Sequence, residues 1–320
     1  MHITLISLDN LGMNSYIVST LEKQGHIVHH INFKHYKYKY PSILHNACNF
    51  ILKAFFKSNL KHQHHGKEII KELQKNNQIQ DVILTIKGDF IDRKSILEFK
   101  KYGKKTIGFF NDNIYRCPNI KRVIPAFDEV YSFEKEDCKK FDLQFATNWI
   151  YTDNDKSTNK DNLEYDVFTI GSIDKRLPVL IRIAEELKSN KINFKFITYS
   201  KKHKTSDDNI TYINKFIPLS EVDQYVSRSK VLLDINRTGQ IGLTFRVFES
   251  LGLEKKLITT NADIKNYDFY NPNNILIIDE KNPVIPVDFF ENDYEKIPAS
   301  IFEKYTVEGW VNNVIFKRSL

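Results

Sequence analysis

Cysteine is scarce in this chain. The 320 residues contain three cysteines, Cys48, Cys117 and Cys138, and none of them lies in a Cys-x-x-Cys pair. The sequence therefore lacks the pattern of a disulfide framework and the ligand spacing of a structural zinc site. We expect three small, partly buried thiols in a reducing compartment.

Long apolar runs and glycine-rich nucleotide motifs are also missing. No stretch of about 18 apolar residues occurs, so we expect no membrane-spanning helix. The opening HITLIS is typical of a strand and lacks the regions of a secretory signal, so we expect none. There is no GxxxxGK(S/T) motif, and LDNLGMN, after the first predicted strand, carries one glycine instead of GxGxxG. A P-loop and the usual dinucleotide motif are thereby excluded.

Acidic residues are absent from 23–67, a segment that contains eight lysines. The whole chain has a net charge of +7; residues 1–150 carry 23 basic and 15 acidic residues (+8), and residues 151–320 carry 24 and 25 (−1). A basic surplus of this kind indicates nucleic acid, anionic lipid or a phosphorylated substrate as partner. Many Lys, Asn and Ile with few Ala and Gly also indicate a general compositional bias.

The first half of the chain alternates strand and helix patterns. Apolar runs predict strands at 3–7, 26–33, 81–86, 105–110 and 129–133, and amphipathic patterns predict helices at 14–23 and 92–101. Continuous apolar strands separated by helices are typical of a parallel sheet covered on both faces, which is the doubly wound α/β fold.

A second α/β series follows the polar segment 152–162, which we interpret as a linker. Strands are predicted at 165–173, 192–200, 209–217, 231–236, 256–261 and 274–279, with helices at 177–189, 219–230, 245–254 and 300–317. We therefore expect two Rossmann-like domains, 1–152 and 163–300, facing a central cleft. Residues 301–320 are expected to form a closing helix, and the family resemblance given below implies that it returns to the first domain.

The loop between the strand at 231–236 and the next helix carries the clearest candidate site. Gly239 and Gly242 allow a tight turn, and the following helix start favours an anion. Arg246 could pair with a phosphate, and Glu249, on nearly the same helix face, could accept hydrogen bonds from ribose. The alternative is a surface ion pair. With Arg246 taken as exposed, Arg246→Ala is predicted to reduce turnover more than stability, and Glu249→Ala to act mostly on donor affinity.

A second cluster, GSIDKR at 171–176, follows the strand at 165–173. Gly171 permits close approach of a ligand, and Lys175 and Arg176 supply cationic donors for a diphosphate. The alternative is an ordinary solvated turn.

These segments resemble the GT-B glycosyltransferases of the group 1 type, which make bacterial surface polysaccharides. The matching segments are FTIGSIDKR, INKFIPLSEVDQYVSRSKVLLDIN, GLTFRVFESLGLEKKLITTN and SIFEKYTVEGWVNNVIF, together about 165–317. The resemblance implies a donor site of Gly171, Ser172, Lys175, Arg176, Phe216, Ile217, Gly242, Leu243, Thr244, Arg246 and Glu249. The family's first glutamate would fall at position 241, which is Ile, and the R-x-x-E element resembles the divergent CgeB-like members.

Polar residues at strand ends in the first half are the candidates for binding an acceptor. They are Asp9, Asn10, Asp89, Asn111, Asp112 and Asn113. Asp112 is the first choice for general base if the reaction inverts, whereas in a retaining reaction these residues would only orient the acceptor. The alternative for each aspartate is a helix cap or a loop hydrogen bond.

Residues 36–61 combine aromatic, basic and apolar character. Tyrosines alternate with lysines in KHYKYKY, and a helix follows with one apolar side and with Lys53, Lys57 and Lys61 four residues apart. The pattern predicts a helix that lies on an anionic membrane surface. The alternative is a core helix with a basic solvated face. The neighbouring HQHH lacks acidic or sulfur partners for a metal.

The expected function is that of a glycosyltransferase. It would move a sugar from a nucleotide-sugar donor to a saccharide acceptor, expected to be lipid-linked, in capsule or lipopolysaccharide synthesis. Arg176 and Arg246, with Lys175, would neutralise the leaving diphosphate. We expect hexosyl transfer with retention, no metal and no cofactor beyond the co-substrate, and no nucleic-acid partner. The expected location is the cytoplasm, at the inner face of the cell membrane. The alternatives are a sugar-nucleotide epimerase of the same fold and a non-catalytic nucleotide- or nucleic-acid-binding protein.

Overall fold

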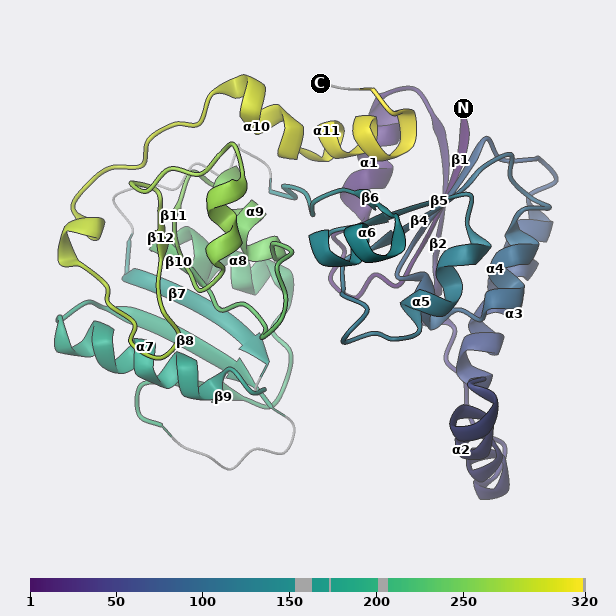
Figure 1. Ribbon diagram of the computed structural model, residues 1–320, viewed down its shortest axis with the longest axis horizontal. Helices are drawn as coiled ribbons and strands as arrows, with labels where there is room; N and C mark the ends of the chain where they lie inside the picture. The colour runs from purple at the N-terminus through teal and green to yellow at the C-terminus, as the bar shows by residue number, and fades with distance from the viewer. Residues whose placement is uncertain (153–162, 173, 201–206, 319–320) are drawn as a thin grey trace. The chain divides into compact units, whose positions relative to one another are not determined.

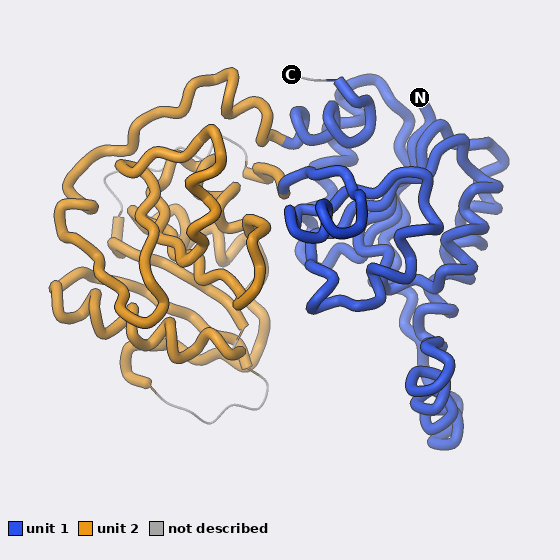
Figure 2. The backbone as a smooth tube through the Cα atoms, in the orientation of Figure 1, with its two compact units in different colours: residues 1–147, 307–320 blue, residues 148–306 orange. Residues whose placement is uncertain are grey.

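A computed structural model describes residues 1–152, 163–172, 174–200 and 207–318. The chain divides into two compact units (Figure 2). Unit 1 comprises Met1–Thr147 together with Val307–Leu320, and unit 2 comprises Asn148–Thr306. Of the segment predicted as a linker, 152–162, all but the first residue lies outside the described residues.

Unit 1 contains a parallel sheet of six strands in the order β2-β1-β3-β4-β5-β6. The strands are β1 (His2–Ser7), β2 (Ile27–Asn32), β3 (Val82–Ile86), β4 (Thr106–Phe110), β5 (Glu129–Ser132) and β6 (Gln144–Phe145). Every residue of β3 and β4 is buried, as their continuous apolar sequences predicted. The helices before the C-terminal segment are α1 (Ser15–Lys23), α2 (Ile43–Phe56), α3 (Leu60–Lys75), α4 (Arg93–Phe99), α5 (Ile120–Val123) and α6 (Lys135–Phe141).

The C-terminal segment belongs to the core of unit 1. It comprises α11 (Val307–Val311) and a π-helical turn, η7 (Asn312–Phe316). The indole Nε1 of Trp310 donates to the carbonyl of Thr147 at 2.9 Å, and its ring packs edge-on against Phe109. The helix predicted over 300–317 is interrupted because Thr306 is extended, which separates α11 from α10 (Ala299–Tyr305) of unit 2.

Unit 2 contains a second six-stranded parallel sheet, in the order β12-β11-β10-β7-β8-β9. The strands are β7 (Tyr165–Ser172), β8 (Phe194–Tyr199), β9 (Thr211–Ile213), β10 (Ser229–Asp234), β11 (Lys256–Thr259) and β12 (Ile275–Ile277). The helices besides α10 are α7 (Leu177–Ser189), α8 (Leu219–Ser227) and α9 (Phe245–Gly252). One apolar core lies between the sheet and α7, and a second lies between the sheet and α8 and α9 (Figure 1).

Each sheet has a point at which the strand order reverses. In unit 1 the chain runs from β1 to β2 on one side and then to β3 on the other; in unit 2 it runs from β7 to β8 and β9 and then returns to β10. Ligands of doubly wound folds bind at such points, beyond the carboxyl ends of the strands. The α/β fold class predicted from the sequence is confirmed, and the topology locates one candidate site in each unit.

The helix α2 projects from unit 1 instead of packing into its core (Figure 1). Asn49 is its one buried residue, and large apolar side chains along it are exposed to solvent. The alternative of a core helix with a basic face is therefore wrong. In the part of the chain that the structure describes, no helix is long and apolar enough to cross a bilayer.

Candidate functional site

In unit 2 the candidate site begins where β7 ends. Gly171 and Ser172 are exposed, and the space in which Gly171 would carry a Cβ is open. The loop continues through Lys175, which is exposed, and Arg176, which is half-buried; Ile173 lies outside the described residues. The glycine therefore leaves room for a ligand to approach the backbone closely.

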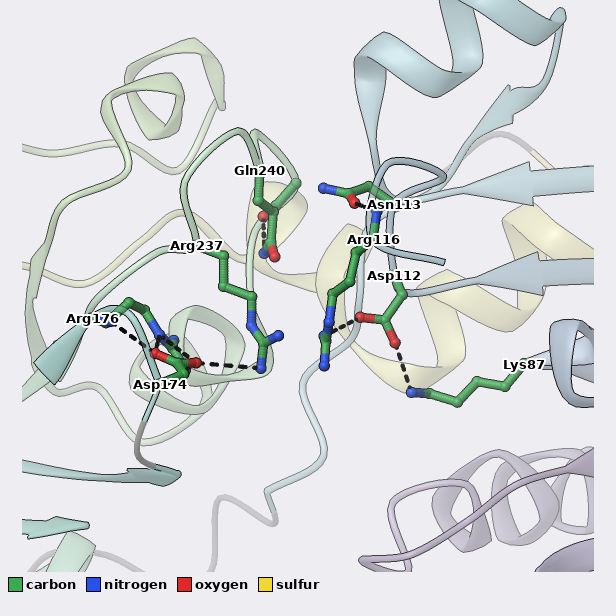
Figure 3. Close-up of polar contacts among 9 residues, drawn as sticks. Lys87, Asp112, Asn113, Arg116, Asp174, Arg176, Arg237 and Gln240 are labelled. Carbon is green, nitrogen blue, oxygen red and sulfur yellow. Dashed lines mark hydrogen bonds and ion pairs between the residues drawn. The ribbon is translucent and has the colours of Figure 1, made fainter. Parts of the chain in front are cut away.

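A carboxylate in this loop holds one arginine and lies near a second (Figure 3). Asp174 Oδ2 accepts from Arg176 Nη2 at 2.8 Å, and Asp174 Oδ1 accepts from Arg176 Nε at 2.9 Å. Arg176 Nη1 also donates to the carbonyl of Ile235, and Arg237 Nη2 lies 3.9 Å from Asp174 Oδ2. Burial would raise the pKa of Asp174, but the hydrogen bonds from Arg176 outweigh burial and lower it. The result is a fixed cationic cluster at the reversal point between β7 and β10.

The loop after β10 is fastened by side-chain amides. Asn236 Nδ2 donates to the carbonyl of Gln240, and Asn261 Nδ2 donates to that of Ile241 at 2.9 Å. Gly239 has a φ of +75°, a left-handed conformation that glycine adopts without strain. Two of the predicted donor residues, Gly242 and Leu243, are buried. They therefore support the loop and do not line an open surface.

Thr244 joins this loop to α9. Its hydroxyl accepts from the backbone N–H of Arg246 as an N-cap, and it donates to Asp234 Oδ1 at 2.8 Å. Asp234 also accepts from Thr259, and burial raises the pKa of this carboxyl. The start of α9 is thus held against the carboxyl end of β10.

Arg246 and Glu249 form a pair inside unit 2. The side chain of Glu249 is 2% exposed and that of Arg246 is 15% exposed. One carboxylate oxygen of Glu249 accepts from Arg246 Nη1, and the other accepts from the Tyr151 hydroxyl at 2.6 Å. The guanidinium also lies over the ring of Phe168. The assumption that Arg246 is exposed, like the alternative of a surface ion pair, is therefore wrong.

An aromatic cavity of about 600 Å³ lies at the carboxyl ends of β8 and β9. Phe216 is 71% exposed, and its ring stacks on Tyr199 with the centroids 3.8 Å apart. Thr211, Asn214 and Ile217 also line the cavity. Its size suits a drug-sized ligand, and an exposed ring offers a stacking surface for a planar group. Because β10, β7, β8 and β9 are consecutive, the cavity and the cationic cluster share one edge of the sheet.

In unit 1 the predicted residue Asp112 follows β4 and contacts two cations (Figure 3). Asp112 Oδ2 accepts from Lys87 Nζ at 2.9 Å, and Asp112 Oδ1 accepts from Arg116 Nη1 at 2.6 Å. Asn113 is buried and its side chain accepts from the backbone N–H of Arg116 at 2.9 Å. The neighbouring Asn111 presents a buried Oδ1 that has no hydrogen-bond partner among the described residues.

Two further predicted aspartates lie at the β1/β3 reversal point and differ in their surroundings. Asp9 accepts three backbone N–H groups, those of Leu11, Gly12 and Asn14, and thereby shapes its own loop. Asn10, the next residue, is exposed, and its carbonyl accepts from Lys34 Nζ. Asp89 is 7% exposed, and burial raises the pKa of its carboxyl to about 6. The pKa of the Asp89 carboxyl thus approaches neutrality, as general acid–base work requires.

Sequence reasoning missed the partners of the predicted residues. Asp174, Tyr199, Lys87 and Arg116 each contact a predicted residue, and Arg237 lies near Asp174. All but Arg116 lie within one residue of the end of a predicted strand, and that position was the available signal; Arg116 lies six residues beyond the strand at 105–110. Within the described ranges, no group of three or more His, Cys, Asp or Glu side chains is arranged to hold a metal ion.

No protein-family model and no curated protein matches the chain. Among solved structures, AviGT4, a glycosyltransferase involved in avilamycin A biosynthesis, is similar with a TM-score of 0.63 at 8% identity, over 99% of this chain and 96% of its own. A UDP-forming α,α-trehalose-phosphate synthase from Burkholderia xenovorans is similar with a TM-score of 0.53 at 9% identity, over 96% and 94%. At these identities the likeness establishes the fold, which is the GT-B fold that the sequence predicted.

Proposed function

We propose that this protein is a glycosyltransferase whose unit 2 binds a nucleotide-sugar donor and whose unit 1 binds a saccharide acceptor. One observation carries the proposal: an aromatic cavity and a cluster of arginines lie along a single edge of the unit 2 sheet, with the arginines at its reversal point. A nucleoside diphosphate needs both features, a stacking surface for the base and cations for the phosphates.

The roles within unit 2 follow from the chemistry of each group. Phe216, with Ile217 beside it, receives the nucleobase. Arg176, Lys175 and the open backbone at Gly171 and Ser172 receive the diphosphate. As the sugar departs, negative charge develops on the diphosphate, and fixed guanidinium groups stabilise it without reorganisation. Gly242, Leu243, Thr244, Arg246 and Glu249 act on the donor indirectly, through the buried frame that holds the loop at 235–244.

In unit 1 we assign the acceptor to the strand ends that carry Asp89 and Asp112. Lys87 and Arg116 hold Asp112, and we assign its fixed carboxylate the role of orienting an acceptor hydroxyl. Asn111 and Asn113 would add amide contacts. If transfer inverts the sugar, Asp89 is the better base because its pKa of about 6 is close to neutral. Retention, which the sequence resemblance favours, needs no such base.

The finer aspects of the proposal rest on the sequence resemblance and on α2. They are hexosyl transfer without a metal, a role in capsule or lipopolysaccharide synthesis, and a lipid-linked acceptor at the inner face of the cell membrane. The exposed apolar residues of α2 support a location next to lipid.

A thermal melt with UDP, GDP and CMP tests the donor site. One nucleotide is expected to raise the unfolding temperature by mass action, and Arg176→Ala and Phe216→Ala should each abolish most of that rise. The matched control for Arg176→Ala is Arg228→Ala, since Arg228 precedes β10 at the opposite edge of the sheet. The control for Phe216→Ala is Val284→Ala, which removes another exposed apolar side chain of unit 2. A rise that survives in both site variants, or is lost in the controls, would contradict the assignment.

Product analysis separates transfer from epimerisation. A transferase releases the nucleoside diphosphate and needs an acceptor, whereas an epimerase converts the sugar nucleotide without one. Binding without either product would leave a nucleotide-binding protein.

A further inference from the structure

The helix α2 exposes an unusual amount of apolar surface. Phe50 is 73% exposed, Phe55 79% and Phe56 68%, and Ile43, Leu44 and Ile51 are exposed as well. Monomeric proteins in water rarely keep such side chains together on one projecting helix. Among the described residues of unit 1, the helix therefore lacks the apolar neighbour that such a surface requires.

The apolar side of α2 faces away from the contacts that hold it. Asn49 Nδ2 donates to the Tyr40 hydroxyl at 2.6 Å, and Asn49 Oδ1 accepts from the backbone N–H of Leu60 at 2.9 Å. Leu52, the helix's half-buried residue, follows Asn49 by three positions and so shares its face. The apolar stripe lies on the side of α2 opposite to Asn49 and Leu52. Helical spacing places Ile43, Ala47, Phe50 and Ala54 along this stripe, with Leu44, Ile51 and Phe55 next to them.

The charge around this apolar face is of one sign. Lys53 lies in the last turn of α2, Lys57 is its C-cap, and Lys61 is in the first turn of α3, so the three lysines do not share one helix as the sequence suggested. All three are exposed, as are Lys37 and Lys39 in the preceding segment, and no acidic residue occurs between 23 and 67. The tyrosines at the base of α2 form an aromatic cluster: Tyr38 packs edge-on against Tyr40, and Lys61 lies over the Tyr40 ring.

We propose that α2 inserts its apolar face into an anionic bilayer, with Lys53, Lys57 and Lys61 at the head groups and Tyr38 and Tyr40 at the interface. Apolar insertion and electrostatic attraction are the two contributions that hold interfacial helices. A lysine gains no electrostatic attraction from a neutral or apolar partner, whereas it is attracted to an anionic lipid surface. A second copy of this chain would carry the same positive charge, so anionic lipid is the favoured partner. No residue of this surface belongs to the proposed donor or acceptor site, so the inference stands or falls without the proposed reaction.

Vesicle flotation of the full chain tests the insertion. The protein should float with vesicles of equal parts phosphatidylcholine and phosphatidylglycerol and much less with phosphatidylcholine alone. Replacing Lys53, Lys57 and Lys61 by Gln should weaken binding about a hundred-fold, because each lysine contributes about 1 kcal/mol at an anionic surface. Phe50→Ser with Phe55→Ser should weaken binding to a similar degree. This loss should be the same at high salt, because salt screens the attraction of the lysines but not the insertion of apolar side chains.

The chain offers matched controls and a built-in probe. Lys94, Lys191 and Lys265 are exposed lysines elsewhere, and their replacement by Gln changes the net charge equally. Cys48 is exposed on α2, whereas Cys117 and Cys138 are half-buried and burial raises the pKa of each thiol to about 11. An environment-sensitive dye should therefore label Cys48 selectively near neutral pH, and its emission should shift to shorter wavelength on anionic vesicles.

Four outcomes would overturn the proposal. The first three are a lack of flotation with anionic vesicles, an equal loss of vesicle binding in the control lysine variant, and an unchanged dye spectrum. The fourth is a wild-type protein that does not bind vesicles and forms an oligomer that the two serine substitutions dissociate. Circular dichroism of each variant establishes that it is folded; if the serine variant is not, Phe50→Leu with Phe55→Leu should bind like the wild type.

Discussion

At the scale of single residues, the ion pair of Arg246 and Glu249 shows how burial changes the meaning of a motif. Three residues apart on a helix, the two side chains suit a surface pair or a ligand site equally well. In the structure Glu249 is 2% exposed, and its partners are Arg246 and Tyr151. A buried carboxylate that loses its cation becomes costly to the fold.

We therefore predict that Arg246→Ala lowers the free energy of unfolding of unit 2 by about 3–5 kcal/mol. Trp149 packs against Phe245 at the start of α9, so its fluorescence during urea unfolding in a Trp310→Phe background reports on unit 2. Arg237→Ala, which removes a half-exposed arginine, should cost less than about 1 kcal/mol. A stable Arg246→Ala protein that had lost nucleotide binding would instead place Arg246 on the donor.

Asp89 should make the stability of unit 1 depend on pH. Burial raises the pKa of its carboxyl from 3.8 to about 6 in the folded state. Between pH 3.8 and about 6 the native state therefore holds a proton that the unfolded state has released. The stability that this proton contributes is fully present below pH 3.8 and is lost as the pH rises through about 6. We predict that Asp89→Asn unfolds at higher urea than the wild type near pH 8, and that this gain disappears near pH 4. A gain of the same size at both pH values would mean that ionisation of Asp89 is not the cause.

At this scale the sequence predicted the positions of candidate residues at strand ends better than it predicted their surroundings. Gly171 and Arg176 were found from their position after an apolar strand, and the structure places both at the reversal point of the sheet. Asp9, chosen by the same rule, is occupied by three backbone N–H groups of its own loop. Strand ends locate candidate residues, but only tertiary packing decides which of their lone pairs remain available.

At the scale of elements, continuous apolar strands were the most predictable feature. The runs at 81–86 and 105–110 are buried strands because both faces of a parallel sheet are covered. The helix α3 was not predicted beyond Lys61, since its histidines and lysines give a weak apolar pattern; Gly66, Ile69 and Leu73 form its buried side. For α2 the sequence predicted a surface helix but left a core helix open as the alternative, because an apolar stripe looks the same whether protein or lipid covers it.

Two explanations of the role of Asp174, in the loop between β7 and α7, predict opposite changes in nucleotide affinity. If Asp174 positions Arg176, Asp174→Ala should weaken binding of a nucleoside diphosphate about ten-fold, because the fork of hydrogen bonds that fixes the guanidinium is lost. If Asp174 acts only as a negative charge near the phosphates, the same variant should bind more tightly. Calorimetric titration with the nucleotide identified by thermal melting measures the difference, and Asp174→Asn, which keeps a hydrogen-bond acceptor, should lie between.

At the scale of the whole molecule, unit 1 is built from two distant parts of the chain. Trp310, Val311, Val314 and Ile315 are at most 5% exposed, although about 160 residues of unit 2 separate them from the rest of unit 1. The sequence predicted a closing helix over 301–320 that returns to the first domain, but not the contacts of Trp310 with Thr147 and Phe109. Because the unit closes only when its last residues return, its stability should depend on them.

We predict that deleting 307–320 destabilises unit 1 and leaves unit 2 able to bind its nucleotide. Losing one buried tryptophan alone costs about 3–5 kcal/mol, a large share of the 5–15 kcal/mol that stabilises a domain. Hydrogen exchange read by mass spectrometry should show lost protection in β1, β3 and β4, while β7 and β10 exchange as in the wild type and are further protected by nucleotide. A chain that ends at Lys317 is the control, because it keeps the buried residues and the 2.6 Å ion pair of Lys317 with Glu129. Equal protection of β3 and β4 in both truncated chains would mean that the C-terminal segment only covers unit 1, and that residues 1–147 fold without it.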